Sequence, residues 1–268
     1  MNGKTWNGAI KPSNAKLTIK NGTINNENAS ISAIEINDGE LNLNNVNIAS
    51  ARHAVRIDGT VTATIDGGEY TLTATSGTRH AVNVSDGAEV TIKAGTFVGP
   101  KGTTMDSGSA VNVQSGATVT IEGGNYSGGK NNTLASAGTL VVTGGTFDQN
   151  PSAYVTTPYV VIKKSDNEYN VIKGVAKIGE TYYESLAAAI TAAQPGNTIE
   201  LCVDITEDVT VNKDLTIDGG NKQYTGNIAV KGSTVNVIVK KVNFVDGTGY
   251  AITTNNINTI TVENCTVT

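Results

Sequence analysis

The chain has 268 residues, of which 30 are glycine and 16% are charged, and its formal net charge is −5. A weakly acidic chain lacks the electrostatic footprint of a nucleic-acid-binding protein, so no nucleic-acid partner is expected. No apolar run approaches the roughly 18 residues of a membrane-spanning helix, so no transmembrane segment is expected. The two cysteines, Cys202 and Cys265, are too few for a disulfide framework, and we predict that both are buried strand positions without a bridge between them.

Residues 1–15, which include Trp6 and Pro12, are predicted to form an irregular lead-in. Met1 is not followed by a basic segment that leads into an apolar one, so the sequence shows no secretory signal. We therefore expect either a piece of a longer exported protein or a protein that reaches the outside without export, as virion proteins do on lysis.

One short phrase recurs six times between residues 16 and 148. It is clearest at Ala63–Tyr70, A-T-I-D-G-G-E-Y, where the first, third and last residues are apolar, as in a half-buried strand. The central glycine or asparagine suits a left-handed bend between two short strands. The third residues of the six copies follow one another at spacings of 24, 22, 27, 29 and 21; they are Ile19, Leu43, Ile65, Ile92, Ile121 and Val142. This period predicts a solenoid, whose units bury their apolar sides by stacking.

A second phrase recurs between copies of the first and supplies a third strand for most coils. It reads H-A-V-R-I at His53–Ile57 and H-A-V-N-V at His80–Val84, with related segments at Ser32–Ile36 and Ser109–Val113. The last coil, about Ser127 to Phe147, is predicted to have lost this strand. Three short parallel strands per coil resemble the right-handed parallel β-helix of pectate-lyase-like proteins, and the handedness follows the general rule for parallel crossovers.

The segment after the first solenoid is predicted to close it. Two alternating runs, Tyr159–Lys163 and Glu168–Ile172, indicate a β-hairpin that covers the open end of the stack. Thr181–Ala193 is then predicted to be a short amphipathic helix that ends before Pro195.

The first phrase returns after this helix, with Ile217, Val239 and Val262 as markers at spacings of 22 and 23. We therefore predict an all-β fold of two consecutive right-handed parallel β-helix modules with a β-hairpin cap and one short capping α-helix. The first module spans residues 1–148, the hairpin cap and linker 149–174, and the helix-capped second module 175–268. Because the chain stops in mid-coil, the second module is expected to be truncated.

The order of these elements resembles the β-helical repeat segments of large surface proteins from gut bacteria and of phage tailspikes or fibres. There, the phrase G-G-T-F-x-x-x-P-S-x-Y-V closes one module before a short helix opens the next; Gly144–Phe147, Pro151-Ser152 and Tyr154-Val155 match it here. The resemblance covers nearly the whole chain. It implies a non-catalytic extracellular scaffold or adhesion module, on a bacterial cell surface or a phage virion, that binds cell-surface or host glycans.

Two alternatives remain open, because this fold also hosts lyases and hydrolases. One is a polysaccharide lyase or hydrolase of the β-helix class, and the other is a purely structural spacer. Tailspikes of this fold are commonly trimers, so a homotrimer is one assembly that the resemblance implies. A row of small residues predicted to face outward would suit such packing or a glycan track; it consists of Ala33, Ala54, Ala81 and Ala110.

The candidate ligand-binding residues are Arg52, His53, Arg56, Arg79 and His80, which include every arginine and histidine of the chain. Alignment of the second phrases places His53 one rung, about 4.8 Å, from His80, and Arg52 beside Arg79. Alternation points both histidines inward and the arginines outward.

Two interpretations of this cluster stay open. In the structural one, the histidines join Ser32 and Ser109 in an internal polar stack, and Glu35 pairs with Arg56 across the strands. In the functional one, Arg52 and Arg79 hold the anion of an acidic glycan, because parallel arginines repel unless a negative group lies between them. The insertions 71–78 and 98–108 would wall that site.

No catalytic residue, metal site or cofactor is predicted. Polygalacturonase-like hydrolases need clustered carboxylates, and the chain has no Asp-Asp pair and no Gly-His-Gly segment. Calcium-dependent pectate lyases need several carboxylates that converge on a metal, whereas Asp58, Asp66 and Asp86 are expected on different faces of their coils.

Overall fold

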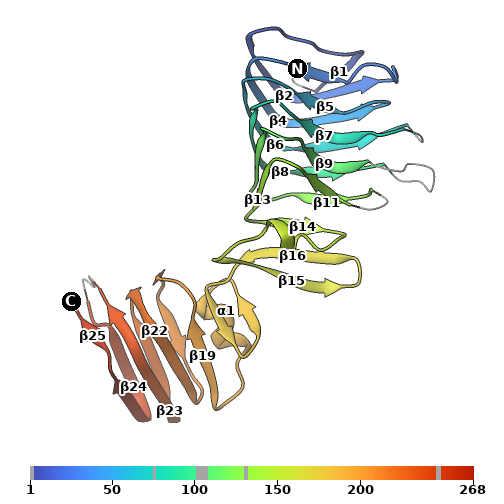
Figure 1. Ribbon diagram of the computed structural model, residues 1–268. Helices are drawn as coiled ribbons and strands as arrows, with labels where there is room; N and C mark the ends of the chain where they lie inside the picture. The colour runs from blue at the N-terminus through green and yellow to red at the C-terminus, as the bar shows by residue number, and fades with distance from the viewer. Residues whose placement is uncertain (1–2, 75–76, 101–107, 130–131, 246–248) are drawn as a thin grey trace. The chain divides into compact units, whose positions relative to one another are not determined.

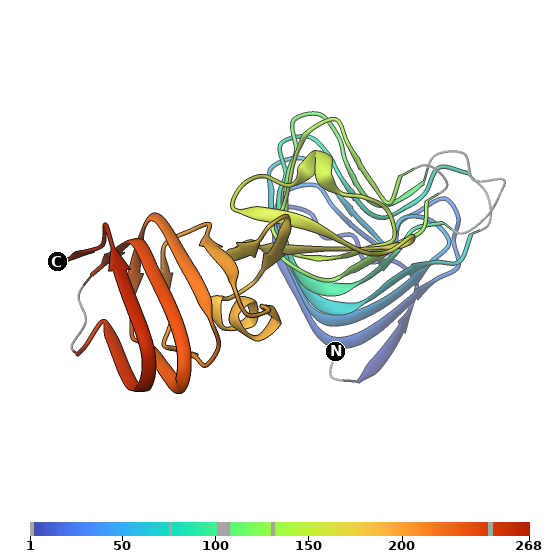
Figure 2. The same ribbon diagram turned by 90° about the horizontal axis from the view of Figure 1, so that it is seen from below.

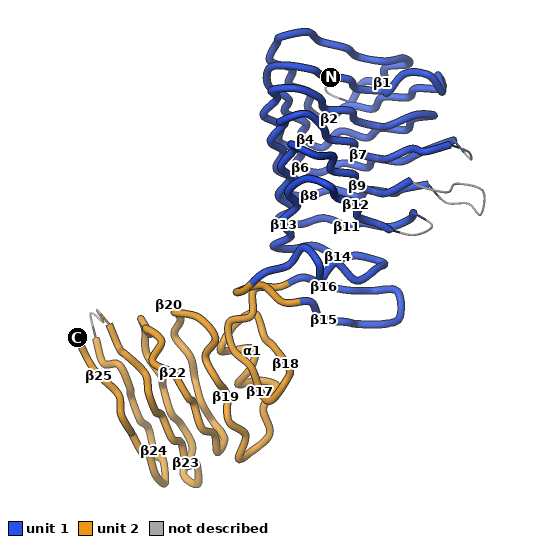
Figure 3. The backbone as a smooth tube through the Cα atoms, in the orientation of Figure 1, with its two compact units in different colours: residues 1–156, 161–171 blue, residues 157–160, 172–268 orange. Residues whose placement is uncertain are grey.

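The computed structural model describes residues 3–74, 77–100, 108–129, 132–245 and 249–268 (Figure 1). They form two compact units, one of residues 1–156 and 161–171 and the other of residues 157–160 and 172–268 (Figure 3). Both units are built from stacked parallel coils, so the predicted all-β parallel β-helix is confirmed. Among the described residues, no helix has the length and apolar character needed to cross a membrane.

Each coil of the first unit adds to a long parallel sheet and to a short one, and the coils lie one on another (Figure 2). The strands of the long sheet that come from these coils are β1 (Lys4–Asn7), β2 (Ala15–Asn26), β4 (Gly39–Ser50), β6 (Val61–Leu72), β8 (Glu89–Val98), β10 (Thr118–Ile121), β11 (Asn125–Ser127), β13 (Thr139–Val142) and β14 (Gly145–Phe147). The strands of the short sheet are β3 (Ile34–Ile36), β5 (Val55–Ile57), β7 (His80–Val84), β9 (Ser109–Val113) and β12 (Leu134–Ser136). The six marker residues from Ile19 to Val142 lie in one register across the long sheet, as the period predicts.

Two expectations about the ends of this solenoid are wrong, the first of them in part. The lead-in is irregular only in part, because β1 pairs in parallel with β2 and brings Trp6 next to Ile24, whereas residues 8–14 lie outside the strands. The last coil keeps its third strand, because Leu134 continues the short sheet opposite Val111. In both places the neighbouring coil supplies a regular edge, which orders a segment whose own sequence carries only a weak strand pattern.

The core of the first unit contains a stack of four buried rings, Tyr70, Phe97, Tyr126 and Phe147. Neighbouring ring centroids are 4.8, 5.0 and 4.8 Å apart, and the planes are within 10° of parallel. The stack follows from the register, since the last residue of each phrase lies over the last residue of the next. The turn before Tyr70 is tight: a side chain at Gly68, where φ is +94°, would collide with the carbonyl oxygen of Val46.

The predicted hairpin is confirmed as β15 (Tyr159–Ser165) and β16 (Glu168–Lys173). β16 pairs with β14 in the antiparallel sense, so it ends the parallel stack of the first unit. A short 3₁₀ helix, Ser152–Tyr154, precedes the hairpin.

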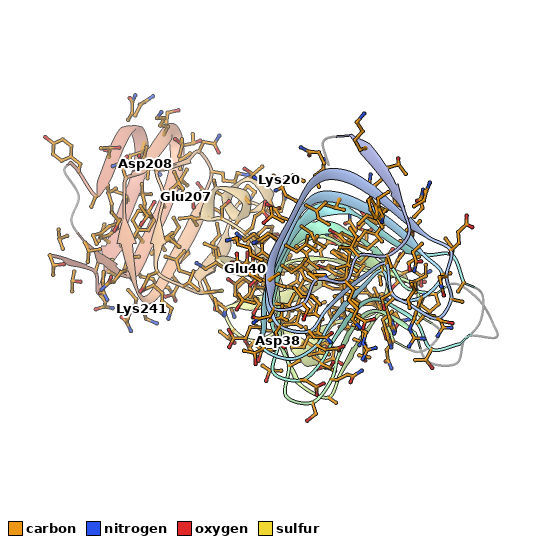
Figure 4. The ribbon with its side chains drawn as sticks, turned by 90° about the horizontal axis from the view of Figure 1, so that it is seen from above. Lys20, Asp38, Glu40, Glu207, Asp208 and Lys241 are labelled. Carbon is orange, nitrogen blue, oxygen red and sulfur yellow. The ribbon has the colours of Figure 1, made fainter. Side chains whose placement is uncertain are left out.

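The second unit opens with β17 (Ala176–Ile178), β18 (Thr181–Tyr183) and α1 (Leu186–Ala192). The predicted helix is therefore shorter than expected, because its first residues form a strand antiparallel to β17. The helix begins where Ser185 accepts the N–H of Ala188 at 3.0 Å, and its apolar face is buried as predicted. The carboxylate of Glu207, labelled in Figure 4, accepts two more N–H groups of the first turn, each at 3.0 Å.

The coils of the second unit repeat the register of the first. Ile199, Ile217, Val239 and Val262 lie opposite one another, so the predicted markers are confirmed. The strands are β19 (Asn197–Leu201), β20 (Ile205–Thr206), β21 (Val209–Val211), β22 (Leu215–Thr225), β23 (Ile228–Phe244), β24 (Ile252–Glu263) and β25 (Thr266–Val267).

The two cysteines are free, as predicted, but neither is a buried strand position. Cys202 follows the last residue of β19, and Cys265 lies between β24 and β25; both are partly exposed. Each stands where the chain leaves a strand and turns, so the alternation of the strand no longer decides its burial.

A substitution at Lys241 should stabilise the second unit. Lys241 has φ +53° at a bend where the equivalent residues of the neighbouring coils are Asn221 and Asn264, with φ +63° and +52°. Asparagine tolerates this left-handed conformation better than lysine, so Lys241→Asn should raise the free energy of unfolding by about 0.5 to 1 kcal/mol. Urea denaturation measures the change. Lys240→Asn is the control, because Lys240 is not among the residues with positive φ and its Nζ lies 3.4 Å from the Asp218 carboxylate. An equal gain in both variants would contradict the argument.

Candidate functional site

The two histidines lie inside the first unit and stack on each other. Their ring centroids are 5.3 Å apart and their planes differ by 4°. Nδ1 of His53 accepts the backbone N–H of His80 at 3.0 Å, and Nδ1 of His80 accepts that of Ser109 at 3.1 Å. Each ring therefore satisfies a backbone donor of the next coil. This arrangement confirms the predicted one-rung spacing and the internal position of the two histidines. The predicted polar stack is wrong at Ser32, whose buried hydroxyl has no hydrogen-bond partner among the described residues.

Burial keeps both imidazoles neutral. Burial and, to a smaller extent, the nearby charges of His80 and Arg52 together lower the pKa of His53 to about 3. Burial likewise lowers the pKa of His80 to about 4. Neutral rings that accept backbone hydrogen bonds hold coils together, and their Nδ1 atoms are not free to take a ligand.

Two of the three arginines contact groups of the protein itself. Nε of Arg56 lies 2.8 Å from the carboxylate of Asp58, which also accepts the hydroxyl of Ser85. Arg79 donates to the carbonyl oxygens of Thr78 at 3.2 Å and Ala29 at 3.4 Å. Its Nε is buried and has no hydrogen-bond partner among the described residues.

The expected ion pair between Glu35 and Arg56 is wrong, although the two residues are opposite each other in the register. Glu35 is paired instead with Lys11 at 2.6 Å, and Arg56 with Asp58. Lys11 reaches Glu35 because the preceding residue, Ile10, forms a parallel bridge with Ile34. The carbonyl oxygen of Ile10 accepts the backbone N–H of Glu35.

The structure therefore divides the five candidate residues. His53 and His80 are internal, whereas Arg52, Arg56 and Arg79 are partly exposed. The insertions that were expected to wall an anion site lie partly outside the described residues, at 75–76 and 101–107. Binding of an acidic glycan between Arg52 and Arg79 stays a prediction.

The alanine row does not face outward to solvent: Ala33, Ala54, Ala81 and Ala110 are each 0% exposed. Alternation tells on which side of a strand a residue lies, but not whether another segment covers that side. The loop after β8 provides one such cover, because a Cβ at Gly99 would lie 2.8 Å from the amide nitrogen of Ala110. The row therefore offers no groove for a glycan or a second subunit.

The outer face of the long sheet is the other repetitive surface of the first unit. One row in register consists of Thr18, Asn42, Thr64, Thr91 and Thr120. Lys20 and Glu40, labelled in Figure 4, flank it. A shallow hollow of about 330 Å³ lies over this row between β2 and β6. The Glu40 carboxylate lies 2.9 Å from Nζ of Lys16 and accepts a hydrogen bond from Nδ2 of Asn42 at 2.6 Å.

The described residues contain no group of three His, Cys, Asp or Glu side chains that could hold a metal ion. The three aspartates considered above have separate surroundings: Asp58 is paired with Arg56, and Asp66 accepts a hydrogen bond from Asn44 at 3.4 Å. Asp86 occupies a left-handed turn with φ +54°.

Comparison with known proteins gives no match to a family model, to a curated protein or to a solved structure. The fold alone therefore defines the class of this protein, which is a β-solenoid with parallel coils.

A second hollow, at the first coils, was not predicted from the sequence, and its lining includes Asn7, Asn25 and Asn28. Its signal was present in the sequence as the run Asn25–Asn28, which contains three asparagines. This run does not stand out in the sequence, because asparagine is common at the turns of this repeat, for example at Asn21 and Asn45.

Proposed function

We propose that the chain is a non-catalytic extracellular scaffold and adhesion module of the pectate-lyase-like type, and that it binds glycans on behalf of a bacterial cell surface or a phage appendage. The observation that supports this proposal is the registered row of hydroxyl and amide side chains on the long sheet, from Thr18 to Thr120. Such groups both donate and accept hydrogen bonds, as sugar hydroxyls do. A solenoid holds them at a fixed spacing of about 4.8 Å per coil.

The second candidate class is a polysaccharide lyase or hydrolase. A glycosidase needs a carboxylic acid whose pKa is raised so that it can donate a proton. Hydrogen bonds from Lys16 and Asn42 lower the pKa of Glu40 on the long sheet, so this carboxyl group is not suited to the role of the acid. The enzyme therefore stays the second candidate.

The third candidate is a rigid spacer that presents some other domain. A solenoid whose surface binds no ligand could serve this function. A homotrimer, as in tailspikes, would be compatible with either the adhesion or the spacer function. The oligomeric state can be measured by light scattering on the same preparation.

A glycan array tests the proposal, with neutral and acidic glycans offered to the intact chain and to an Arg52→Ala/Arg79→Ala variant. We expect the intact chain to bind glycans without releasing shorter products. Loss of acidic-glycan binding in the folded variant would place the site at the arginines. Absence of binding to every glycan would favour the spacer, and release of shorter products would favour the enzyme.

A further inference from the structure

The first coils carry a groove that crosses several strands of the long sheet and is lined mainly by asparagine, threonine and glutamate residues. A hollow of about 640 Å³ is lined by residues that include Asn7, Gly8, Asn25, Asn28 and Thr73. A smaller hollow of about 130 Å³ continues it and shares Asn25 and Ala49. Together the two hollows extend over β1, β2, β4 and β6, so the groove runs across the coils rather than along one strand.

The register explains why the surface is hollowed at this place. Asn7, Asn25, Ala49 and Thr71 lie opposite one another on successive coils. Ala49 is the smallest of the four and stands between the side chains of Asn25 and Thr71, which leaves a depression in the row. At the first coil Gly8 has no side chain to fill the space.

Hydrogen bonds of neighbouring residues fix the walls of the groove, whereas the side-chain amide of Asn25 is available for a ligand. Asn26 donates to the carbonyl of Ile31 at 2.7 Å and to Ser50 Oγ at 3.2 Å, which fixes the turn after β2. Asn47 accepts the backbone N–H of Glu69 at 3.0 Å on the other side. The side chain of Asn25 is half-buried and makes no hydrogen bond with the described residues. It can therefore donate to and accept from a ligand.

Trp6 lies near one end of the groove but not among the residues that line it. It is 50% exposed and stands opposite Ile24, in the row that faces the interior, and a Cβ at Gly8 would lie 3.5 Å from its Nε1. Only a ligand that extends past Gly8 would reach this ring, whose apolar surface suits the C–H face of a sugar.

The charge of the groove argues against an acidic ligand. Among the described residues, the charged ones that line the groove are the carboxylates Glu27 and Glu69, and none is a lysine or an arginine. A uronate or sulfate would be repelled there and would lose hydration without gaining a cationic partner. Uncharged sugar hydroxyls can instead donate to the carboxylates and exchange hydrogen bonds with the amides.

We propose that this groove binds an uncharged glycan chain that crosses the coils from β1 to β6. The inference rests on the proposed glycan-binding function and names its site and ligand class. Because several coils contribute lining residues, a chain of several sugars should bind more tightly than a single sugar.

The test compares the binding of cellohexaose, chitohexaose and hexagalacturonate by calorimetry. Ala49→Arg fills the depression and should weaken binding of the uncharged oligosaccharides at least tenfold. Ala229→Arg is the matched control, because Ala229 is also a half-buried outward alanine on a central strand, between Thr210 and Thr253. Asn25→Ala adds no bulk and should also weaken binding. This variant tests the groove if Ala49→Arg does not fold.

The outcomes separate the site from the function. Binding of an uncharged oligosaccharide that falls with Ala49→Arg or Asn25→Ala, and not with Ala229→Arg, supports the groove. Binding that both groove variants retain, or binding of hexagalacturonate alone, overturns the groove and leaves the adhesion function standing. No binding of any glycan by the intact chain, on the array or in solution, overturns both.

Discussion

Lowering the pH from 7.5 to 5 will destabilise the first unit by about 4 kcal/mol through His53 and His80. In the folded chain their pKa values are about 3 and about 4, whereas an unfolded histidine titrates near 6.5. Between these values the unfolded state binds protons that the folded state does not, so stability falls as the pH falls. Each histidine contributes a loss of about 1.4 kcal/mol per pH unit below 6.5, which is about 2 kcal/mol at pH 5.

The physical cause is the internal position of the two rings. A proton on either histidine would have to be accommodated in a buried stack whose Nδ1 atoms already accept backbone N–H groups. A second proton would place two positive charges on rings 5.3 Å apart. The loss should therefore begin near pH 6.5 and continue toward pH 4, with little change above pH 7.

Urea denaturation at several pH values measures this effect, and a His53→Asn/His80→Asn variant is the control. The asparagine Oδ1 atom stands close to the position of histidine Nδ1, so the variant keeps an acceptor for each N–H but does not titrate. The carboxylates are the same in both proteins, so their contribution to the pH dependence of the unfolding free energy cancels in the comparison. If the double variant loses as much stability between pH 7.5 and 5 as the natural chain does, the histidines are not responsible.

Replacement of Phe97 by alanine will cost about 4 kcal/mol of unfolding free energy, the range found for buried Phe→Ala changes. Phe97 is 0% exposed and lies between Tyr70 and Tyr126, with ring centroids 4.8 and 5.0 Å away. Its removal creates a cavity in the middle of the stack, and the rings on either side cannot close it because their strands are held in register by the long sheet.

Chemical denaturation measures the loss, with two substitutions for comparison. Phe97→Leu keeps most of the volume and should cost clearly less than Phe97→Ala. Tyr250→Ala removes an aromatic side chain that is 81% exposed and should change stability by less than about 0.5 kcal/mol. A similar cost for Phe97→Ala and Tyr250→Ala would contradict the view that the stack holds the coils together.

The histidine stack is internal and the proposed groove lies on the surface, so substitutions at the two places are expected to change different properties. His53 and His80 are directed inward and link backbone to backbone, so substitutions there are expected to act on stability. Asn25 and Ala49 face outward, so substitutions there are expected to act on binding. Measuring both properties on each variant distinguishes a lost site from a lost fold.

Much of this structure was predictable from the sequence because the repeat is local and regular. Alternation of apolar and polar residues decides which side of a strand each residue takes, and the period decides which residue lies beside it on the next coil. These two rules are enough to place Ile65 next to Ile92 and to stack His53 on His80. The helical period of 3.6 residues likewise predicts the buried face of the helix after Ser185.

The remaining features depended on which distant segments come together. Whether Ala110 is exposed depends on the loop that packs over it, and whether Glu35 pairs with Arg56 depends on Lys11, which comes from the preceding coil. The groove at Ala49 likewise exists only because Asn25 and Thr71 stand on either side of it in the stack. The sequence by itself thus determined most of the strands, their register and the inner face of each coil. The tertiary structure decided the weak strands at the ends, such as β1 and β12, the partners of the side chains and the shape of the outer surface, because those depend on contacts between residues far apart in the chain.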